Sequence, residues 1–215
     1  MATIAENLQA IRKRLGSVTL LAVSKGQSVA KIQQAVTAGQ RAFGENYVQE
    51  ALEKMETLQG VEWHLIGPLQ SNKTRIAAER FDWVQTVASE KIARRLSEQR
   101  PAGMAPLNVL IQVNASGEAS KSGVAPAAAA ALASSITRMK NIRLRGLMAI
   151  PEPQAPHERF GEVNVLFRKL KGEFGFDTLS MGMSDDMELA IAEGSTMVRI
   201  GTAIFGAREK ARHVA

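Results

Sequence analysis

A lysine at the end of a short apolar run is the first candidate for chemistry in this chain. Residues 20–23 (LLAV) have the composition of a buried strand, and Ser24, Lys25 and Gly26 follow directly. A strand end is also where a chain leaves the core, so Lys25 could be an ordinary solvated residue. The sharper interpretation is an amine at the mouth of a pocket, because lysine forms Schiff bases with carbonyl compounds. The run alone leaves both interpretations open.

Two later segments contain residues suited to binding an anion. In SMGMSDD, Gly182 and Ser184 precede a predicted helix, and in MVRIGT, Gly201 and Thr202 lie at the end of a predicted strand. Small residues let backbone N–H groups approach a phosphate, and a helix N-terminus adds partial positive charge. Caps and turns have the same composition, so neither segment is specific by itself.

Asp185 and Asp186 oppose this interpretation, because both follow Ser184 directly. Carboxylates stabilise the first turn of a helix, but they repel a phosphate that they face. A phosphate site here therefore requires both aspartates to face outward.

An amine, a phosphate cradle and a guanidinium together suit pyridoxal 5'-phosphate (PLP), a phosphorylated ring that carries an aldehyde. Lysine reacts as the free amine, so burial and a positive neighbour must lower its pKa from roughly 10.4 toward about 7–8. Arg199 stays protonated and can only donate a hydrogen bond, which would leave the ring nitrogen unprotonated. A ring held in this way is a weaker electron sink than one paired with an aspartate.

Strand and helix patterns alternate along the chain, and they must bring these residues together. The predicted strands are Thr19–Ser24, Arg41–Gly44, Glu62–Gly67, Trp83–Val87, Leu107–Asn114, Leu144–Ile150, Thr178–Met183 and Met197–Gly201. The predicted helices between them are Val29–Ala38, Tyr47–Leu58, Asn72–Glu79, Ser89–Gln99, Pro126–Met139, His157–Lys171 and Asp185–Ala192, preceded by an extra amphipathic helix at the N-terminus.

About eight β-α units predict an α/β fold, the (β/α)₈ TIM-type barrel, as one domain over residues 1–215. An open doubly wound sheet is the alternative, although no glycine-rich dinucleotide fingerprint follows the first strand. In a barrel, closure makes the first and last strands neighbours, and active sites lie at the carboxyl ends of the strands. Lys25 and Arg199 are then expected side by side at one rim.

Composition argues against several classes of protein. The chain has no cysteine for disulfides, and no apolar stretch approaches the roughly 20 residues of a membrane helix. We expect a cytoplasmic protein. The net charge of +6 invites nucleic-acid binding, but the basic residues are scattered and aromatic residues make up only 5% of the chain. We expect neither nucleic acid nor a membrane as the partner.

The chain also resembles a known family, the YggS-like PLP homeostasis proteins, which are single-domain PLP-binding barrels. The matching stretches cover nearly the whole chain: LLAVSK, FGENYVQE, WHLIGPLQSNK, SKSG, DTLSMGMSDD and GSTMVRIGTAIFGAR. The resemblance implies the PLP-binding barrel also seen in alanine racemase. It further implies a protein that controls the level and delivery of this vitamin B6 cofactor, without a settled catalytic reaction.

The resemblance assigns roles to individual residues. The Schiff-base lysine falls on Lys25, the arginine on the pyridine side falls on Arg199, and a residue close to the ring falls on Asn46. The family's phosphate contacts fall on Ser184, Gly201 and Thr202. After the lysine this chain has Gly-Gln-Ser where relatives often have Thr-Lys-Pro, so the local loop shape is expected to differ.

A PLP-dependent racemase-like enzyme is the alternative function. Alanine racemase adds a second domain and a tyrosine on the opposite ring face, whereas this chain is short and Tyr47 is its only tyrosine. His64 lies inside a predicted strand and is expected to be a hydrogen-bonded core residue. The three histidines are widely spaced and indicate no metal site.

Lys73 and Lys121 lie in loops on the expected active rim and are weaker candidates for PLP contact or transfer. Neither directly follows an apolar strand, so Lys25 ranks first. The expected partners are PLP itself and, transiently, PLP-dependent apoenzymes. The expected oligomeric state is a monomer.

Overall fold

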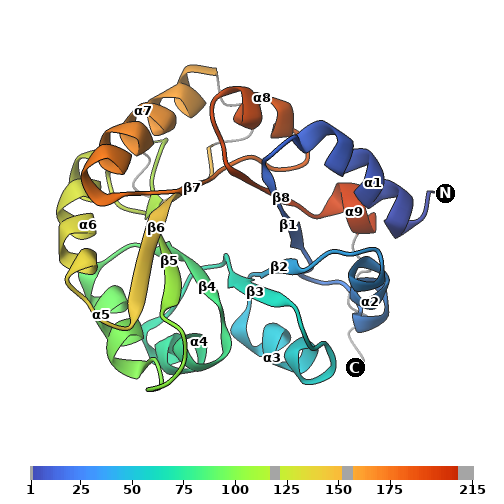
Figure 1. Ribbon diagram of the computed structural model, residues 1–215, viewed down its shortest axis with the longest axis horizontal. Helices are drawn as coiled ribbons and strands as arrows, with labels where there is room; N and C mark the ends of the chain where they lie inside the picture. Colours follow the sequence, from blue (N-terminus) through green and yellow to red (C-terminus); the bar gives the residue numbers. More distant parts are fainter. Residues whose placement is uncertain (1, 117–121, 152–156, 208–215) are drawn as a thin grey trace, which may run out of the picture.

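The computed structural model describes residues 2–116, 122–151 and 157–207. Its strands are parallel and form a closed barrel in sequence order, in which β8 pairs with β1 (Figure 1). The strands are β1 (Thr19–Val23), β2 (Ala42–Glu45), β3 (Glu62–Leu65), β4 (Trp83–Val87), β5 (Leu107–Val113), β6 (Ile142–Ala149), β7 (Thr178–Ser180) and β8 (Met197–Ile200). The predicted barrel is confirmed.

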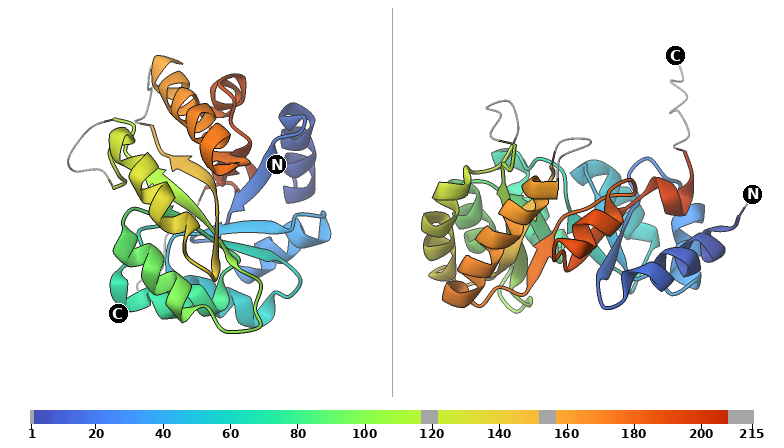
Figure 2. Two further views of the ribbon diagram at one scale, coloured as in Figure 1. Left: turned by 60° about the vertical axis from the view of Figure 1, so that its left-hand side comes forward. Right: turned by 90° about the horizontal axis from the view of Figure 1, so that it is seen from above.

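Helices surround the barrel on its outside (Figures 1 and 2). They are α1 (Ile4–Leu15), α2 (Val29–Thr37), α3 (Val48–Thr57), α4 (Thr74–Arg80), α5 (Glu90–Gln99), α6 (Ala129–Thr137), α7 (His157–Phe174), α8 (Met187–Ala192) and α9 (Thr202–Phe205), with 3₁₀ turns η1 (Ser71–Lys73) and η2 (Pro126–Ala128). Among the described residues, no helix has the length and apolar character needed to cross a membrane.

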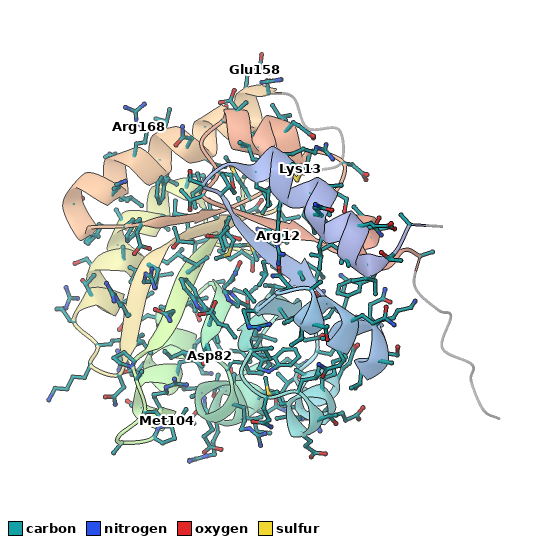
Figure 3. All side chains as sticks on the ribbon, turned by 45° about the vertical axis from the view of Figure 1, so that its right-hand side comes forward. Arg12, Lys13, Asp82, Met104, Glu158 and Arg168 are labelled. Carbon is teal, nitrogen blue, oxygen red and sulfur yellow. The ribbon has the colours of Figure 1, made fainter. Side chains whose placement is uncertain are left out.

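The extra N-terminal helix α1 is stabilised by a cap at its start and by apolar residues at helical spacing. Thr3 and Glu6 exchange hydrogen bonds in a capping box, which satisfies donors at the helix start. The buried side chains recur at helical spacing, and they are Ile4, Leu8, Ile11 and Leu15. This stripe packs toward the barrel, while Lys13 points outward, as Figure 3 shows, and Arg12 donates hydrogen bonds to the Ala38 carbonyl oxygen and to Gln40.

The segment after β7 differs from the prediction. The strand ends at Ser180 rather than Met183, and α8 begins at Met187 rather than Asp185. Gly182 causes the difference, because its φ of 97° turns the chain out of the strand conformation. Residues 181–186 therefore form an irregular segment that ends in a turn, at the carboxyl end of the barrel.

The strands separate two cores. The larger apolar core lies between the strands and the helices, where β5 contributes Val109, Ile111 and Val113. Successive strand side chains point to opposite faces, so Leu110 points into the barrel. There it packs with Trp83 and Met148 in a small apolar cluster.

A bulge in β6 places Arg145 beside that inner cluster. Val109 pairs with Leu144 and Leu110 pairs with Gly146, so Arg145 is the extra residue. The Arg145 guanidinium lies 4.8 Å from the centre of the Trp83 ring and forms an ion pair with Asp177 at 2.8 Å. Glycine is required at position 146, because its φ is 153° and a Cβ there would lie 1.9 Å from the carbonyl oxygen of Thr178.

Gly146→Ala should therefore lower the free energy of unfolding by roughly 1–3 kcal/mol, since the backbone of β7 must shift. Gly172→Ala is the matched control, because a Cβ at this helical position meets nothing within 4 Å. The control should stabilise the protein by about 0.5–1 kcal/mol. Urea unfolding measures both effects, and equal effects of the two substitutions would contradict the steric argument.

Candidate functional site

The six residues predicted to form the site come together in one cavity at the carboxyl ends of the strands. The cavity has a volume of about 310 Å³, and its lining includes Lys25, Asn46, Ser184, Arg199, Gly201 and Thr202. Arg199 belongs to β8, and the other five lie in the segments that follow β1, β2, β7 and β8. Lys25 and Thr202 lie near opposite ends of the sequence, yet they share one cavity because β8 pairs with β1.

The pairing of β1 with β8 places the amine and the guanidinium in the same cavity. Leu21 pairs with Arg199 in the parallel register, and the chain reaches Lys25 four residues after Leu21. Alternation along β1 points Leu21 and Val23 to the same side, and both Val23 and Lys25 line the cavity. Lys25 and Arg199 therefore line one cavity at the carboxyl ends of β1 and β8.

Arg199 is buried, with 5% of its surface exposed. Its Nη1 donates to the carbonyl oxygen and the hydroxyl oxygen of Ser180, both at 2.8 Å, and its Nη2 donates to the Ala149 carbonyl oxygen at 2.9 Å. Burial lowers the pKa of Arg199 to about 10, against the attraction of Asp186, so the guanidinium stays charged at neutral pH. These three bonds leave two of the five N–H donors of an arginine for a ligand.

Small and hydroxyl residues form another part of the lining. A Cβ on Gly201 would lie 3.2 Å from the Val23 carbonyl oxygen, and a Cβ on Gly182, beside the cavity, would lie 2.5 Å from the Cβ of Ala190. Glycine at both positions therefore lets the chain pass close to its neighbours. Ser184 and Thr202 add hydroxyl groups to the lining.

The two aspartates after Ser184 differ from the expectation. Asp185 is exposed but is among the residues that line the cavity, so the expectation that both aspartates lie away from the site is not met at this residue. Asp186 accepts a hydrogen bond from the Met183 backbone N–H at 2.5 Å. The reason is the late start of α8, which leaves Asp185 in the preceding turn instead of the first helical turn.

A second cavity of about 310 Å³ adjoins the first. The two share Asn46, Ile66 and Ile150, and the described residues that line the second cavity include no charged side chain. Gly67 allows Asn46 to lie at this boundary, because a Cβ on Gly67 would lie 2.1 Å from the Asn46 carbonyl oxygen.

A buried ion cluster holds the backbone on both sides of Lys25, and the sequence analysis did not find it. Lys54 Nζ donates to the Ser24 carbonyl oxygen, to Glu45 and to Glu50, each at 2.7 Å. Glu50 also accepts from the Gly26 N–H at 2.5 Å. The residue before Lys25 and the residue after it are thus bound to the same cluster.

Burying charged groups favours unfolding, so the charges of this cluster must be paired with one another. Burial raises the pKa of Glu45, while the Lys54 ammonium and the hydrogen bond from the Ser24 hydroxyl oppose that rise. Lys54 is 4% exposed and Glu45 is fully buried, with its Oε2 atom lacking a hydrogen-bond partner within the described part of the chain. The i, i+4 spacing of Glu50 and Lys54 on α3 was the available sequence signal, but it is common on solvated helices.

The remaining candidates lie elsewhere. Tyr47 is 66% exposed at the start of α3, and Lys73 lies in η1 outside the lining of both cavities. His64 is a buried, hydrogen-bonded core residue, as predicted. Lys121 lies outside the described residues. Within residues 2–116, 122–151 and 157–207, no group of three or more side chains could hold a metal ion.

Comparison with known proteins agrees with this geometry. Residues 1–209 match the family described as alanine racemase, N-terminal domain. A pyridoxal phosphate homeostasis protein of Pseudomonas aeruginosa is 54% identical, and the match covers 97% of each chain.

Solved structures of similar proteins have the same barrel fold. The structure of PipY from Synechococcus elongatus PCC7942 with PLP bound has a TM-score of 0.85 and 37% identity, and the match covers 95% of this chain and 100% of PipY. Alanine racemase from Corynebacterium glutamicum has a TM-score of 0.75 at 19% identity, with 97% of this chain and 62% of the racemase covered. The second likeness concerns the fold alone.

Lys54→Met should lower the free energy of unfolding by about 3–5 kcal/mol, because it leaves the buried Glu45 carboxylate without its partner. Adding Glu45→Gln should restore part of the loss. Arg94→Met is the control, since Arg94 and Glu90 form an exposed pair whose loss should cost at most about 1 kcal/mol. Urea unfolding of the unsubstituted protein and the three variants measures these losses, and similar losses for Lys54→Met and Arg94→Met would contradict the role of the buried cluster.

Proposed function

This chain belongs to the family of pyridoxal phosphate homeostasis proteins, and on that premise we propose that it binds PLP in the Lys25 cavity and controls the supply of this cofactor. The observation that carries the proposal is the convergence of Lys25, Arg199, Ser184 and Thr202 on one cavity. When bound, the cofactor supplies an aldehyde that forms a Schiff base with a lysine amine.

The cavity fits such a ligand in size and chemistry. Its volume of about 310 Å³ is at the lower end of the range for small-molecule sites, roughly 300–1,000 Å³. The unused N–H donors of Arg199 suit an acceptor such as a ring nitrogen, and they would not protonate it. Ser184, Gly201 and Thr202 suit the phosphate, and Asn46, which lines both cavities, suits a contact with the ring.

We further propose that the chain holds and releases PLP without turning over a substrate. The described lining of the Lys25 cavity contains one lysine and no tyrosine or histidine, and its remaining acid-base residue is Asp185, in the turn before α8. We propose that Asp185 does not act as a second proton-transfer group. The proposal includes a single-domain monomer in the cytoplasm and transient contact with PLP-dependent apoenzymes.

A racemase-like enzyme is the competing function, because the barrel is shared with alanine racemase. The experiment is to load the purified protein with PLP, record its absorbance before and after borohydride reduction, and assay alanine racemisation on the same sample. We expect a Schiff-base band that is lost on reduction, and no sustained racemisation. Sustained racemisation would overturn the proposal that the chain is a carrier.

Lys25→Ala should abolish covalent attachment of PLP while leaving the fold intact. Peptide mapping after borohydride reduction locates the pyridoxyl group, and Lys73→Ala is the control that should keep it. A main adduct on Lys73 or Lys121 in the unsubstituted protein would show that Lys25 is not the reactive amine.

Thr202→Val should weaken the binding of PLP more than the binding of pyridoxal. The hydroxyl matters only when the phosphate is present, and a hydrogen bond to a charged group contributes about 1.5–3 kcal/mol. Equilibrium dialysis with both ligands measures the difference. Equal losses for PLP and pyridoxal would place Thr202 away from the phosphate.

A further inference from the structure

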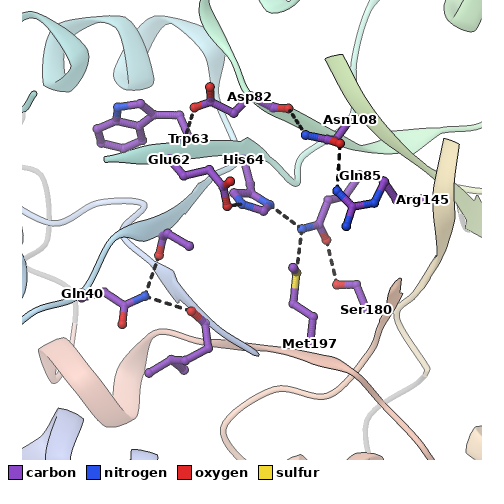
Figure 4. Close-up of polar contacts among 12 residues, drawn as sticks. Gln40, Glu62, Trp63, His64, Asp82, Gln85, Asn108, Arg145, Ser180 and Met197 are labelled. Atoms are coloured by element: carbon purple, nitrogen blue, oxygen red, sulfur yellow. Dashed lines mark hydrogen bonds and ion pairs between the residues drawn. The ribbon is translucent and has the colours of Figure 1, made fainter. Parts of the chain in front are cut away.

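A continuous row of polar side chains crosses the interior of the barrel, starting from Arg199 in the cavity. Arg199 Nη1 lies 2.8 Å from Ser180 Oγ, and Ser180 Oγ lies 2.7 Å from Gln85 Oε1. Gln85 Nε2 lies 2.9 Å from His64 Nδ1, and His64 Nε2 lies 2.7 Å from Glu62 Oε1. Figure 4 shows the row from Ser180 to Glu62, which begins β3 at the opposite end of the barrel. We call these five residues the interior chain.

The chemistry of the two ends determines the direction of every hydrogen bond. Arginine can only donate, so Ser180 Oγ accepts from Arg199 and directs its own proton toward Gln85. The Gln85 oxygen accepts that proton, and its amide nitrogen donates to His64 Nδ1. His64 must then carry its proton on Nε2, where it donates to the Glu62 carboxylate. All the donors point away from Arg199.

The protonation state of His64 agrees with this direction of the hydrogen bonds. Burial lowers the pKa of His64, against the effects of Glu62 and Asp82, so the ring is neutral at pH 7. The ring stacks on Trp83 with 5.0 Å between ring centres. The Gln85 amide is also fully satisfied, because its second N–H donates to Met197 Sδ at 3.2 Å.

The interior chain compensates the buried positive charge of Arg199. The guanidinium is buried, and Asp186 attracts it, but none of the ion pairs found among the described residues involves Arg199. A buried charge needs compensation from hydrogen bonds and oriented dipoles. The interior chain turns acceptor atoms toward Arg199 and ends on Glu62, whose side chain is 47% exposed. TIM-type barrels usually fill this space with branched apolar residues, so a polar row here indicates a specific role.

We propose that Ser180, Gln85 and His64 are positioning residues that keep Arg199 oriented toward the bound ligand, with Glu62 as the far anchor. The inference rests on the proposed function for the identity of the ligand, but the interior chain itself exists without it. Gln85→Met tests the proposal, because methionine has a similar volume and cannot link Ser180 to His64.

Gln40→Met is the matched control. Gln40 is also a buried glutamine, and its amide donates to the carbonyl oxygens of Leu20 and Ala42 at 2.9 and 2.8 Å. It lies outside the interior chain, as Figure 4 shows. The two substitutions remove comparable hydrogen bonds, so a general loss of stability should appear in both.

The first measurement uses the ligand-free protein. Nitrogen NMR of His64 should show a protonated Nε2 and a hydrogen-bonded, unprotonated Nδ1. Exchange of the Arg199 guanidinium protons should become at least about tenfold faster in Gln85→Met, and it should change less than about twofold in Gln40→Met. A proton on Nδ1 of His64, or equal exchange in the two variants, would overturn the proposal.

The second measurement compares PLP with an analogue in which a C–H group replaces the ring nitrogen. Gln85→Met should weaken PLP binding about tenfold, in line with one weakened charge-assisted hydrogen bond, and should change binding of the analogue less than about twofold. Ser180→Ala, a smaller change that also breaks the interior chain, should show the same selectivity. Equal weakening of both ligands would show that the interior chain does not act through the ring nitrogen.

The two measurements also separate this inference from the proposed function. Failure of the unsubstituted protein to bind PLP or the analogue would refute the proposed function. The NMR measurement needs no ligand, so it would still decide whether the interior chain orients Arg199.

Discussion

The pairing of β8 with β1 is the contact on which the site depends. It closes the barrel and sets Leu21 opposite Arg199, so the residues that follow β1 lie beside those that end β8. Without closure, Lys25 and Arg199 would belong to opposite edges of an open sheet. The cavity is therefore a property of the closed barrel and does not belong to any single segment.

Closure places the two basic groups, and separate polar clusters hold them. The backbone around Lys25 is held by α3, where Lys54 binds Ser24 and Glu50 binds Gly26. Arg199 is held from inside the barrel, through Ser180. Buried polar groups favour unfolding unless they are paired, and this cost explains why most of the polar atoms in both clusters have partners.

The same barrel can serve different chemistry, because function depends on the groups at the rim. The lining here includes a lysine, an arginine, hydroxyl residues and Asp185, and the described lining of the adjoining cavity has no charged residue. Among those residues, a substrate carboxylate would find no cation in the second cavity.

The sequence by itself determined the barrel and the residues of the candidate site to a large extent. Short apolar strands alternating with amphipathic helices predict the architecture. The position of Lys25 directly after an apolar strand can also be recognised in the sequence. The tertiary structure alone decided the turn that brings Asp185 into the cavity, the cluster around Lys54 and the interior chain from Arg199 to Glu62. Their partners lie on different strands and helices, and a strand residue's polar partner depends on register and on which face it occupies. Those relations arise only when the barrel closes, because closure determines which side chains share its interior.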